Sequence, residues 1–156
     1  MAQEEQNSRK TIYLAEDDED DRILFMEALR EIHPEIAVKV SEDGQQLLDN
    51  LDKTDCGKPE IIFLDINMPC KNGFECLKEI RSASCFDDVQ VIMLSTSSSS
   101  IHIEMSRKLG ADFYAVKPGL FQDLKDLLQQ ILEEGGSRGT ADRSKFLLSR
   151  RRMDAF

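Results

Sequence analysis

Apolar and polar positions follow a regular order along this chain, in which short apolar runs alternate with longer stretches of helical periodicity. An apolar run of four to eight residues bounded by polar or turn-forming residues is typical of a strand. Five such runs predict strands, at residues 11–15, 36–40, 60–66, 89–95 and 112–117. The third and fourth are apolar almost throughout, as expected for strands buried on both faces of a parallel sheet.

Each predicted strand is followed by a stretch in which apolar residues recur three or four positions apart, the spacing of one helix face. These stretches predict helices at 20–32, 42–52, 74–83, 101–109 and 120–132. In the fourth helix the apolar spacing is carried by Ile101, Met105 and Leu109. Residues 52–59 read as a polar loop before the third strand.

Five strand–helix pairs of this length predict an α/β fold with a doubly wound parallel sheet, flavodoxin-like, with helices on both faces. The expected strand order is 2-1-3-4-5, with right-handed crossovers. In such sheets, ligands bind beyond the carboxyl ends of the strands, where the first and third strands lie side by side. That edge of the sheet is therefore where functional residues are expected.

Length and charge suggest one domain with two flanking segments. We expect a polar N-terminal segment at 1–9, a domain at 10–134 and a basic tail at 135–156, which is too short for an effector domain. The tail holds six of the 20 bases and two of the 30 acids, net +4, which leaves net −14 for residues 1–134. Such an acidic body argues against nucleic-acid binding. We expect the tail to lie loosely against this body or to be disordered.

The composition also indicates a cytoplasmic protein with no membrane segment. No apolar run approaches the ~18 residues of a membrane span, and the N-terminus lacks a signal-peptide core. The four cysteines form no Cys-x-x-Cys pair, so we interpret them as reduced and structural.

The densest negative charge lies where the first strand turns into the first helix. Six consecutive acids occupy residues 16–21, and Asp65 ends the third strand. In the expected strand order, Glu16, Asp17 and Asp65 converge. Two unpaired carboxylates ~4 Å apart repel by ~4 kcal/mol at an effective dielectric near 20, so the cluster needs a proton or a cation. A set of oxygen ligands alone favours magnesium, calcium or manganese.

Two further strands end at the same edge with groups that suit a phosphate. Ser95 ends the fourth strand and offers a hydroxyl donor, and Lys117 ends the fifth and offers an amine. Taken singly, each residue has a simpler interpretation: the acidic run as a solvated helix start, Asp65 as a helix N-cap, Ser95 as a turn residue and Lys117 as a surface charge. Their joint placement favours a site.

Two other classes fit less well. A haloacid-dehalogenase-type phosphatase would need a second Asp two residues after Asp65, where this chain has Asn67. A nucleotide binder would need a Gly-rich loop after the first strand, where six acids would repel a phosphate.

The segments "LAEDDEDDR", "FLDINMPCKNG", "VIMLSTS" and "GADFYAVKPG" resemble the receiver domain of two-component response regulators over residues 10–134. The likeness is to stand-alone, chemotaxis-regulator-like receivers, and the loop at 52–59 further resembles the phytochrome-associated subgroup. The departures are Ser95 for a frequent Thr and Gly119 where an aromatic often follows the Lys-Pro.

The resemblance implies a role for each matching position. Asp65 accepts a phosphoryl group from a phosphohistidine, and Mg²⁺ is held by Asp17, Asp65 and the Asn67 carbonyl with help from Glu16. Ser95 and Tyr114 form a conformational switch, in which Ser95 moves inward and vacates space for the Tyr114 ring, and Lys117 binds the phosphate. The resemblance also implies a cis Lys117–Pro118 bond.

The expected function is that of a single-domain response regulator in a phosphorelay. Its partners would be a sensor histidine kinase or phosphotransfer protein and a downstream protein target, with a homodimer through 101–109, 112–117 and 120–132 as a further use of that surface. It would phosphorylate and dephosphorylate itself without being a turnover enzyme. The alternative is a receiver-like interaction module that works without phosphorylation.

Overall fold

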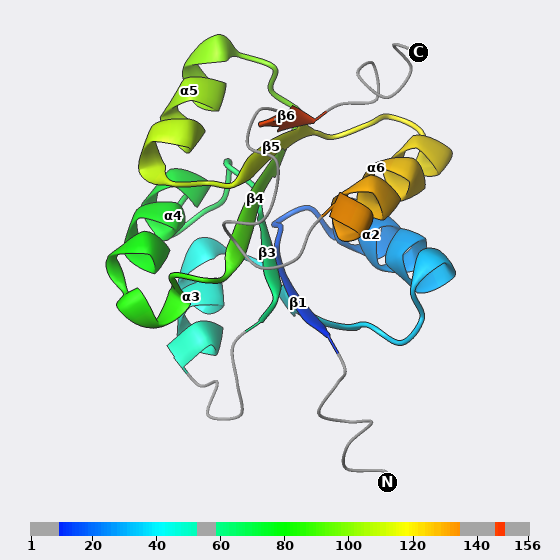
Figure 1. The fold of residues 1–156 in the computed structure, drawn as a ribbon, viewed down its shortest axis with the longest axis horizontal. Coiled ribbons are helices and arrows are strands. Elements are labelled where there is room, and N and C mark those ends of the chain that lie inside the picture. The colour runs from blue at the N-terminus through cyan, green and yellow to red at the C-terminus, as the bar shows by residue number, and fades with distance from the viewer. Residues whose placement is uncertain (1–9, 53–58, 135–145, 149–156) are drawn as a thin grey trace, which may run out of the picture.

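The computed structural model describes residues 10–52, 59–134 and 146–148, which form a parallel sheet between two layers of helices (Figure 1). The sheet order is β2-β1-β3-β4-β5-β6, and every neighbouring pair is parallel. The strands are β1 Thr11–Ala15, β2 Ala37–Ser41, β3 Ile61–Leu64, β4 Gln90–Ser95, β5 Phe113–Val116 and β6 Leu147–Leu148. The predicted flavodoxin-like order 2-1-3-4-5 is confirmed, with one strand added at its end.

The helices alternate with the strands as predicted. In Figure 1, α3, α4 and α5 cover one face of the sheet, and α2 and α6 cover the other. Their bounds are α2 Glu19–Ile32, α3 Gly44–Asp52, α4 Gly73–Ser82, α5 Ser100–Leu109 and α6 Phe121–Glu134, with a short 3-10 turn, η1, at Ser84–Phe86. Within the described residues, no helix is long and apolar enough to cross a membrane.

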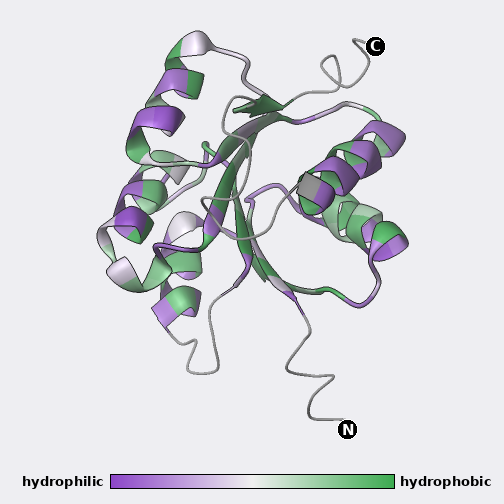
Figure 2. Cartoon of the chain, in the orientation of Figure 1, coloured by the Kyte–Doolittle hydropathy of each residue, from purple (hydrophilic) through white to green (hydrophobic). Residues whose placement is uncertain are grey.

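Alternate residues of each central strand supply the two apolar cores, because successive side chains of a strand point to opposite faces. In β1, Ile12 and Leu14 pack with α2 and α6, whereas Tyr13 and Ala15 pack on the α3–α5 side. The central strands are therefore mostly apolar, and Figure 2 shows them as largely green between helices that mix green and purple. This double burial explains the continuous apolar runs of the sequence.

Two of the three residues of one predicted apolar stripe lie on the surface. Ile101 and Met105 of α5 are 72% and 43% exposed. The inner side of α5 is instead formed by residues such as Ile103, which packs against the core, and the buried Ser106. The spacing predicted the helix correctly, but of the three regularly spaced apolar residues only Leu109 packs against the core.

The tail contributes a strand, which the sequence analysis did not predict. Leu147–Leu148 pairs with β5, and the Tyr114 amide donates to the Phe146 carbonyl at 2.8 Å. The expectation of a loose or disordered tail is wrong for residues 146–148, because Phe146 and Leu148 are buried at 4% and 2% exposure. The rest of the tail and the segment 1–9 lie outside the described residues.

The predicted cis Lys117–Pro118 bond is also wrong, since the described residues contain no cis peptide bond. The trans form is the common one even before proline. The long side chain of Lys117 reaches the acids at the ends of β1 and β3 from this trans backbone.

A buried ion pair joins α4 to the start of β5. Arg81 donates to Asp112 at 2.8 Å, to the Gly110 carbonyl at 2.9 Å and to the Phe86 carbonyl at 3.0 Å. The same Asp112 carboxylate accepts the Val91 amide at 2.9 Å. The Asp112 side chain is 1% exposed, so the arginine is needed to compensate its charge.

Replacing Arg81 with Met should destabilise the fold by about 3–5 kcal/mol, because the substitution leaves a charged carboxylate buried. Urea unfolding followed by circular dichroism measures this loss. The control is Glu79→Gln, which breaks the more exposed Lys71–Glu79 pair and should cost about 0–1 kcal/mol. Equal losses in the two variants would contradict the structural role of the Arg81–Asp112 pair.

Candidate functional site

The pairing of β1 with β3 brings the first two acidic positions together. Ala15 is in register with Leu64, so Glu16 and Asp65 follow at neighbouring strand ends. The Asp65 amide donates to the Ala15 carbonyl at 3.0 Å, and the Glu16 amide donates to the Ser41 carbonyl of β2 at 3.0 Å. The backbones of both acids are therefore fixed by the sheet itself.

Glu16, Asp17 and Asp65 form a cluster of carboxylates, as the sequence predicted. One oxygen of each lies within 4.8 Å of the others. Glu16 and Asp65 are buried, at 2% and 7% exposure, whereas Asp17 is exposed to solvent. Three carboxylate oxygens at this spacing, one of them open to water, fit a hard divalent cation that keeps some of its waters.

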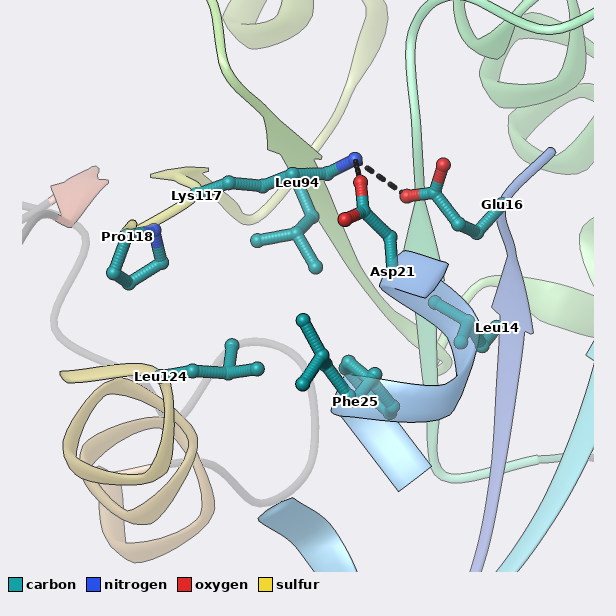
Figure 3. A pocket seen from close by; sticks show the side chains of 9 residues that line it. Leu14, Glu16, Asp21, Phe25, Leu94, Lys117, Pro118 and Leu124 are labelled. Atoms are coloured by element: carbon teal, nitrogen blue, oxygen red, sulfur yellow. Dashed lines mark hydrogen bonds and ion pairs between the residues drawn. The ribbon is translucent and has the colours of Figure 1, made fainter. Parts of the chain in front are cut away.

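Lys117 extends from the end of β5 toward this cluster (Figure 3). Its Nζ lies 2.5 Å from Glu16 Oε1, 3.0 Å from Asp21 Oδ2 and 3.8 Å from Asp65 Oδ2. The Lys117 amide donates to the Ser95 carbonyl at 2.8 Å, which ties the ends of β4 and β5 together. One ammonium thus faces several carboxylates, and negative charge remains in excess when all of them are ionised.

Burial and this crowding of charge alter the protonation of the site. Burial, together with the negative charge of Asp65, raises the pKa of Glu16 to about 7 even though Lys117 bonds to it. Burial raises the pKa of Asp65 despite the nearby Lys117 charge. Burial lowers the pKa of Lys117, but the bond to Glu16 and the charge of Asp65 outweigh it, so this pKa lies above its ordinary value. The two carboxyl shifts therefore reflect mainly burial, and the lysine shift reflects the negative charge around its ammonium.

The hydroxyls of Ser95 and Tyr114 both bind the loop that follows β4. Ser95 is 1% exposed, and its Oγ accepts the Ser97 amide at 3.1 Å. The Tyr114 ring is 0% exposed, and its hydroxyl donates to the Ser97 carbonyl at 2.8 Å. The predicted switch places the ring inward only after Ser95 has moved; here Tyr114 is already in the buried position.

Asn67 is exposed in the loop after β3, and its predicted role as a ligand through its carbonyl stays a prediction. The loop is held close to the site by Gly73, the first residue of α4, whose amide donates to the Ile66 carbonyl at 2.8 Å. A Cβ on Gly73 would lie 2.3 Å from the Asp65 carbonyl oxygen, so only glycine permits this approach.

The structure adds three residues that the sequence analysis did not assign to the site. Asp21 was interpreted as part of a solvated helix start, but it binds Lys117. Arg22 donates from Nη1 to the Glu16 carbonyl at 2.9 Å, and Ser97 links Ser95 to Tyr114. The available signal for Asp21 was its position in the first turn of α2, which starts at the site because Asp18 caps it.

The pocket below Lys117 is small. Its apolar lining, which Figure 3 shows between α2 and the start of α6, comes from residues such as Leu24, Phe25, Leu94, Pro118 and Leu124. Its volume of about 50 Å³ is far below the 300–1,000 Å³ of typical small-molecule sites. The geometry therefore favours chemistry at the open carboxylate cluster rather than binding of an organic cofactor in this pocket.

Comparisons with known proteins agree with this geometry. A family model, the response regulator receiver domain, matches residues 12–129, which is more than half of the 156 residues. The chain belongs to this family. A chemotaxis protein CheY homolog of Campylobacter jejuni is 32% identical over 102 residues, which cover 65% of this chain and 77% of that protein.

Solved receiver structures are similar over most of the chain. The phosphorylated cyanobacterial phytochrome response regulator RcpA has a TM-score of 0.77 at 28% identity, over 85% of this chain and 100% of RcpA. The Mn²⁺-bound form of the response regulator Rcp1 has a TM-score of 0.71 at 28% identity, over 78% and 91%. The resemblance to receivers and to their phytochrome-associated subgroup is confirmed.

Gly73→Ala should displace the loop that carries Asn67 and the Asp65 backbone, because the added methyl group meets a backbone oxygen that cannot easily move. We expect a loss of about 1–3 kcal/mol in the free energy of unfolding, as for other overpacked sites. The matched control is Gly119→Ala, since a Cβ there has nothing within 4 Å. Chemical denaturation compares the two, and equal stability would contradict the close approach at Gly73.

Proposed function

We propose that this receiver domain is a single-domain response regulator that accepts a phosphoryl group on Asp65 with the help of Mg²⁺. The observation that carries the proposal is the convergence of Asp65 with the acids Glu16 and Asp17 and the amine of Lys117. The buried Ser95 hydroxyl at the end of β4 supports it, because a phosphorylated Asp65 would need hydrogen-bond donors.

The chemistry is phosphoryl transfer from nitrogen to oxygen. A carboxylate oxygen of Asp65 forms a bond to phosphorus while the P–N bond of a phosphohistidine breaks and its electron pair returns to the imidazole. A divalent cation held by Asp17, Asp65 and the Asn67 carbonyl, with Glu16 assisting, would offset the negative charge of the phosphoryl oxygens. Such transfers require positioning and charge stabilisation above all, which explains a site without a histidine base.

Lys117 and Ser95 act on the product. Phosphorylation adds about −1.5 to −2 charge and three acceptor oxygens. The Lys117 ammonium, 3.8 Å from Asp65, donates to one phosphoryl oxygen, and the Ser95 hydroxyl, which accepts the Ser97 amide, donates its own proton to another. Because Ser97 also binds the Tyr114 hydroxyl, a change at Ser95 is transmitted to the position of Tyr114.

The partners follow from this chemistry. A histidine kinase or a phosphotransfer protein would supply the phosphoryl group, and a downstream protein, or a second copy of the chain, would bind the surface of α5, β5 and α6. The protein would return to its initial state by hydrolysing its own phosphoaspartate rather than by turning over an external substrate. A receiver-like module that binds partners without phosphorylation is the alternative that the experiments below test.

Asp65→Asn should abolish phosphorylation, because an amide cannot act as the nucleophile. After treatment with phosphoramidate and Mg²⁺, intact-mass measurement should detect one added phosphoryl group in the wild-type protein and none in Asp65→Asn. The control is Asp20→Asn, an exposed acid of the same run, which should be labelled normally. Labelling of Asp65→Asn at the wild-type rate would show that the nucleophile is misassigned.

Asp17→Ala should weaken binding of a divalent cation by about tenfold or more, since one of the charged carboxylate ligands of the cation is lost. Mn²⁺ is a suitable probe, because the free ion can be counted by its paramagnetic resonance signal. Asp20→Ala serves as the control for net charge and should bind Mn²⁺ as the wild type does. Unchanged affinity in Asp17→Ala would place the cation elsewhere.

A further inference from the structure

The sixth strand lies outside the part of the chain that matches the receiver family, which ends at residue 129. Without β6, the outer edge of β5 would be the edge of the sheet. An exposed edge strand with an apolar sequence is a template for unwanted pairing, and proteins commonly cover it. Residues 146–148 provide such a cover from the chain's own tail, and we call them the latch.

The latch is held on both faces of the sheet. Phe146 belongs to the core cluster on the α3–α5 side, and Leu148 belongs to the cluster on the α2–α6 side. The guanidinium of Arg107 on α5 lies 4.6 Å from the centre of the Phe146 ring, within the range of a cation–π contact. The side chains of this short segment thus contact both layers of the fold.

The latch also contacts Tyr114, whose hydroxyl binds the loop after Ser95. Tyr114 donates its amide to the Phe146 carbonyl at 2.8 Å, and its hydroxyl to the Ser97 carbonyl at 2.8 Å. Its side chain shares a core cluster with Phe146. Tyr114 therefore connects the latch on one side to the loop that follows Ser95 on the other.

We propose that the latch keeps Tyr114 in its buried position by occupying the edge of β5. The latch has to leave β5 before Tyr114 can turn outward, and before a partner protein can pair with that edge. A strand of two paired residues makes few backbone hydrogen bonds. Its detachment therefore costs less free energy than unfolding of the central sheet. This inference rests on the proposed function only for the signalling role of Tyr114.

The chain offers a clean reporter for this inference. It contains two tyrosines and no tryptophan, so Tyr13→Phe leaves Tyr114 as the single fluorescent tyrosine. Quenching of its fluorescence by acrylamide measures how accessible the ring is. The measurement uses the full chain without a phosphodonor, so its outcome is independent of whether Asp65 is phosphorylated.

In the Tyr13→Phe background, Phe146→Ser should open the latch. We expect the quenching constant of Tyr114 to rise by about threefold, as for a locally exposed residue, while far-ultraviolet circular dichroism stays unchanged. The control is Leu120→Ser, which removes an apolar side chain that is 65% exposed and should leave quenching unaltered. A Tyr114 ring that stays shielded in Phe146→Ser would overturn the proposal.

Two further measurements complete the test, the first on the wild-type protein and the second on the wild type beside Phe146→Ser. Hydrogen exchange should find the Tyr114 amide protected, because it is bonded to Phe146; an amide exchanging at the rate of an open chain would overturn the latch even if Phe146→Ser failed to fold. Sedimentation should give the same mass for the wild type and for Phe146→Ser. A dimer that this substitution converts to monomers would show that the segment pairs with a second copy, which contradicts an intramolecular latch.

Discussion

The arrangement of the site depends on one electrostatic constraint, the meeting of Lys117 with the carboxylates at the ends of β1 and β3. The parallel order of the sheet forces Glu16 and Asp65 to lie side by side, and burial denies them the screening of water. The trans peptide that follows Lys117 still allows its ammonium to reach both acids and Asp21. The ammonium reduces the repulsion without neutralising it.

That remaining negative charge is what gives the site its chemistry. A site balanced by one lysine would be a structural ion pair, like Arg81 with Asp112, and would have no reason to bind a cation. Here Asp17 adds a carboxylate that is open to solvent, next to two that are buried. A divalent cation, and through it a phosphoryl group, is the natural complement of such a cluster. In the proposed function, Lys117 and Ser95 would then donate hydrogen bonds to the phosphoryl oxygens.

Much of this could be predicted from the sequence, because the relevant signals are local or follow from topology. The apolar runs gave the strands, the strand order gave the meeting of Glu16 with Asp65, and the four motifs gave the family. Asp21 was missed because a run of charged residues at a helix start looks the same whether it is solvated or bound to a residue 96 positions away. Arg22 was missed because it binds a backbone carbonyl, that of Glu16, which the residue types do not reveal. The inward Tyr114 is a choice between side-chain conformations, which no periodicity encodes.

The strand in the tail could not be predicted from the sequence either. Its basic composition suggested a loose segment, and the short apolar stretch at 146–148 is too brief to predict a strand. It forms one because β5 presents an apolar edge and Arg107 a cation for the Phe146 ring, both of which exist only in the folded domain. The family model ends before this strand, so that model could not supply it.

The central claim is that Asp65, and no other residue, receives the phosphoryl group. The most direct measurement is to treat the phosphorylated protein with borohydride, which reduces an acyl phosphate to an alcohol, and to locate the product by tandem mass spectrometry. The account predicts homoserine at position 65 alone, and only when the protein was incubated with both a phosphodonor and Mg²⁺. Homoserine at any other acidic position, or a phosphoryl group retained on a histidine or serine, would contradict it.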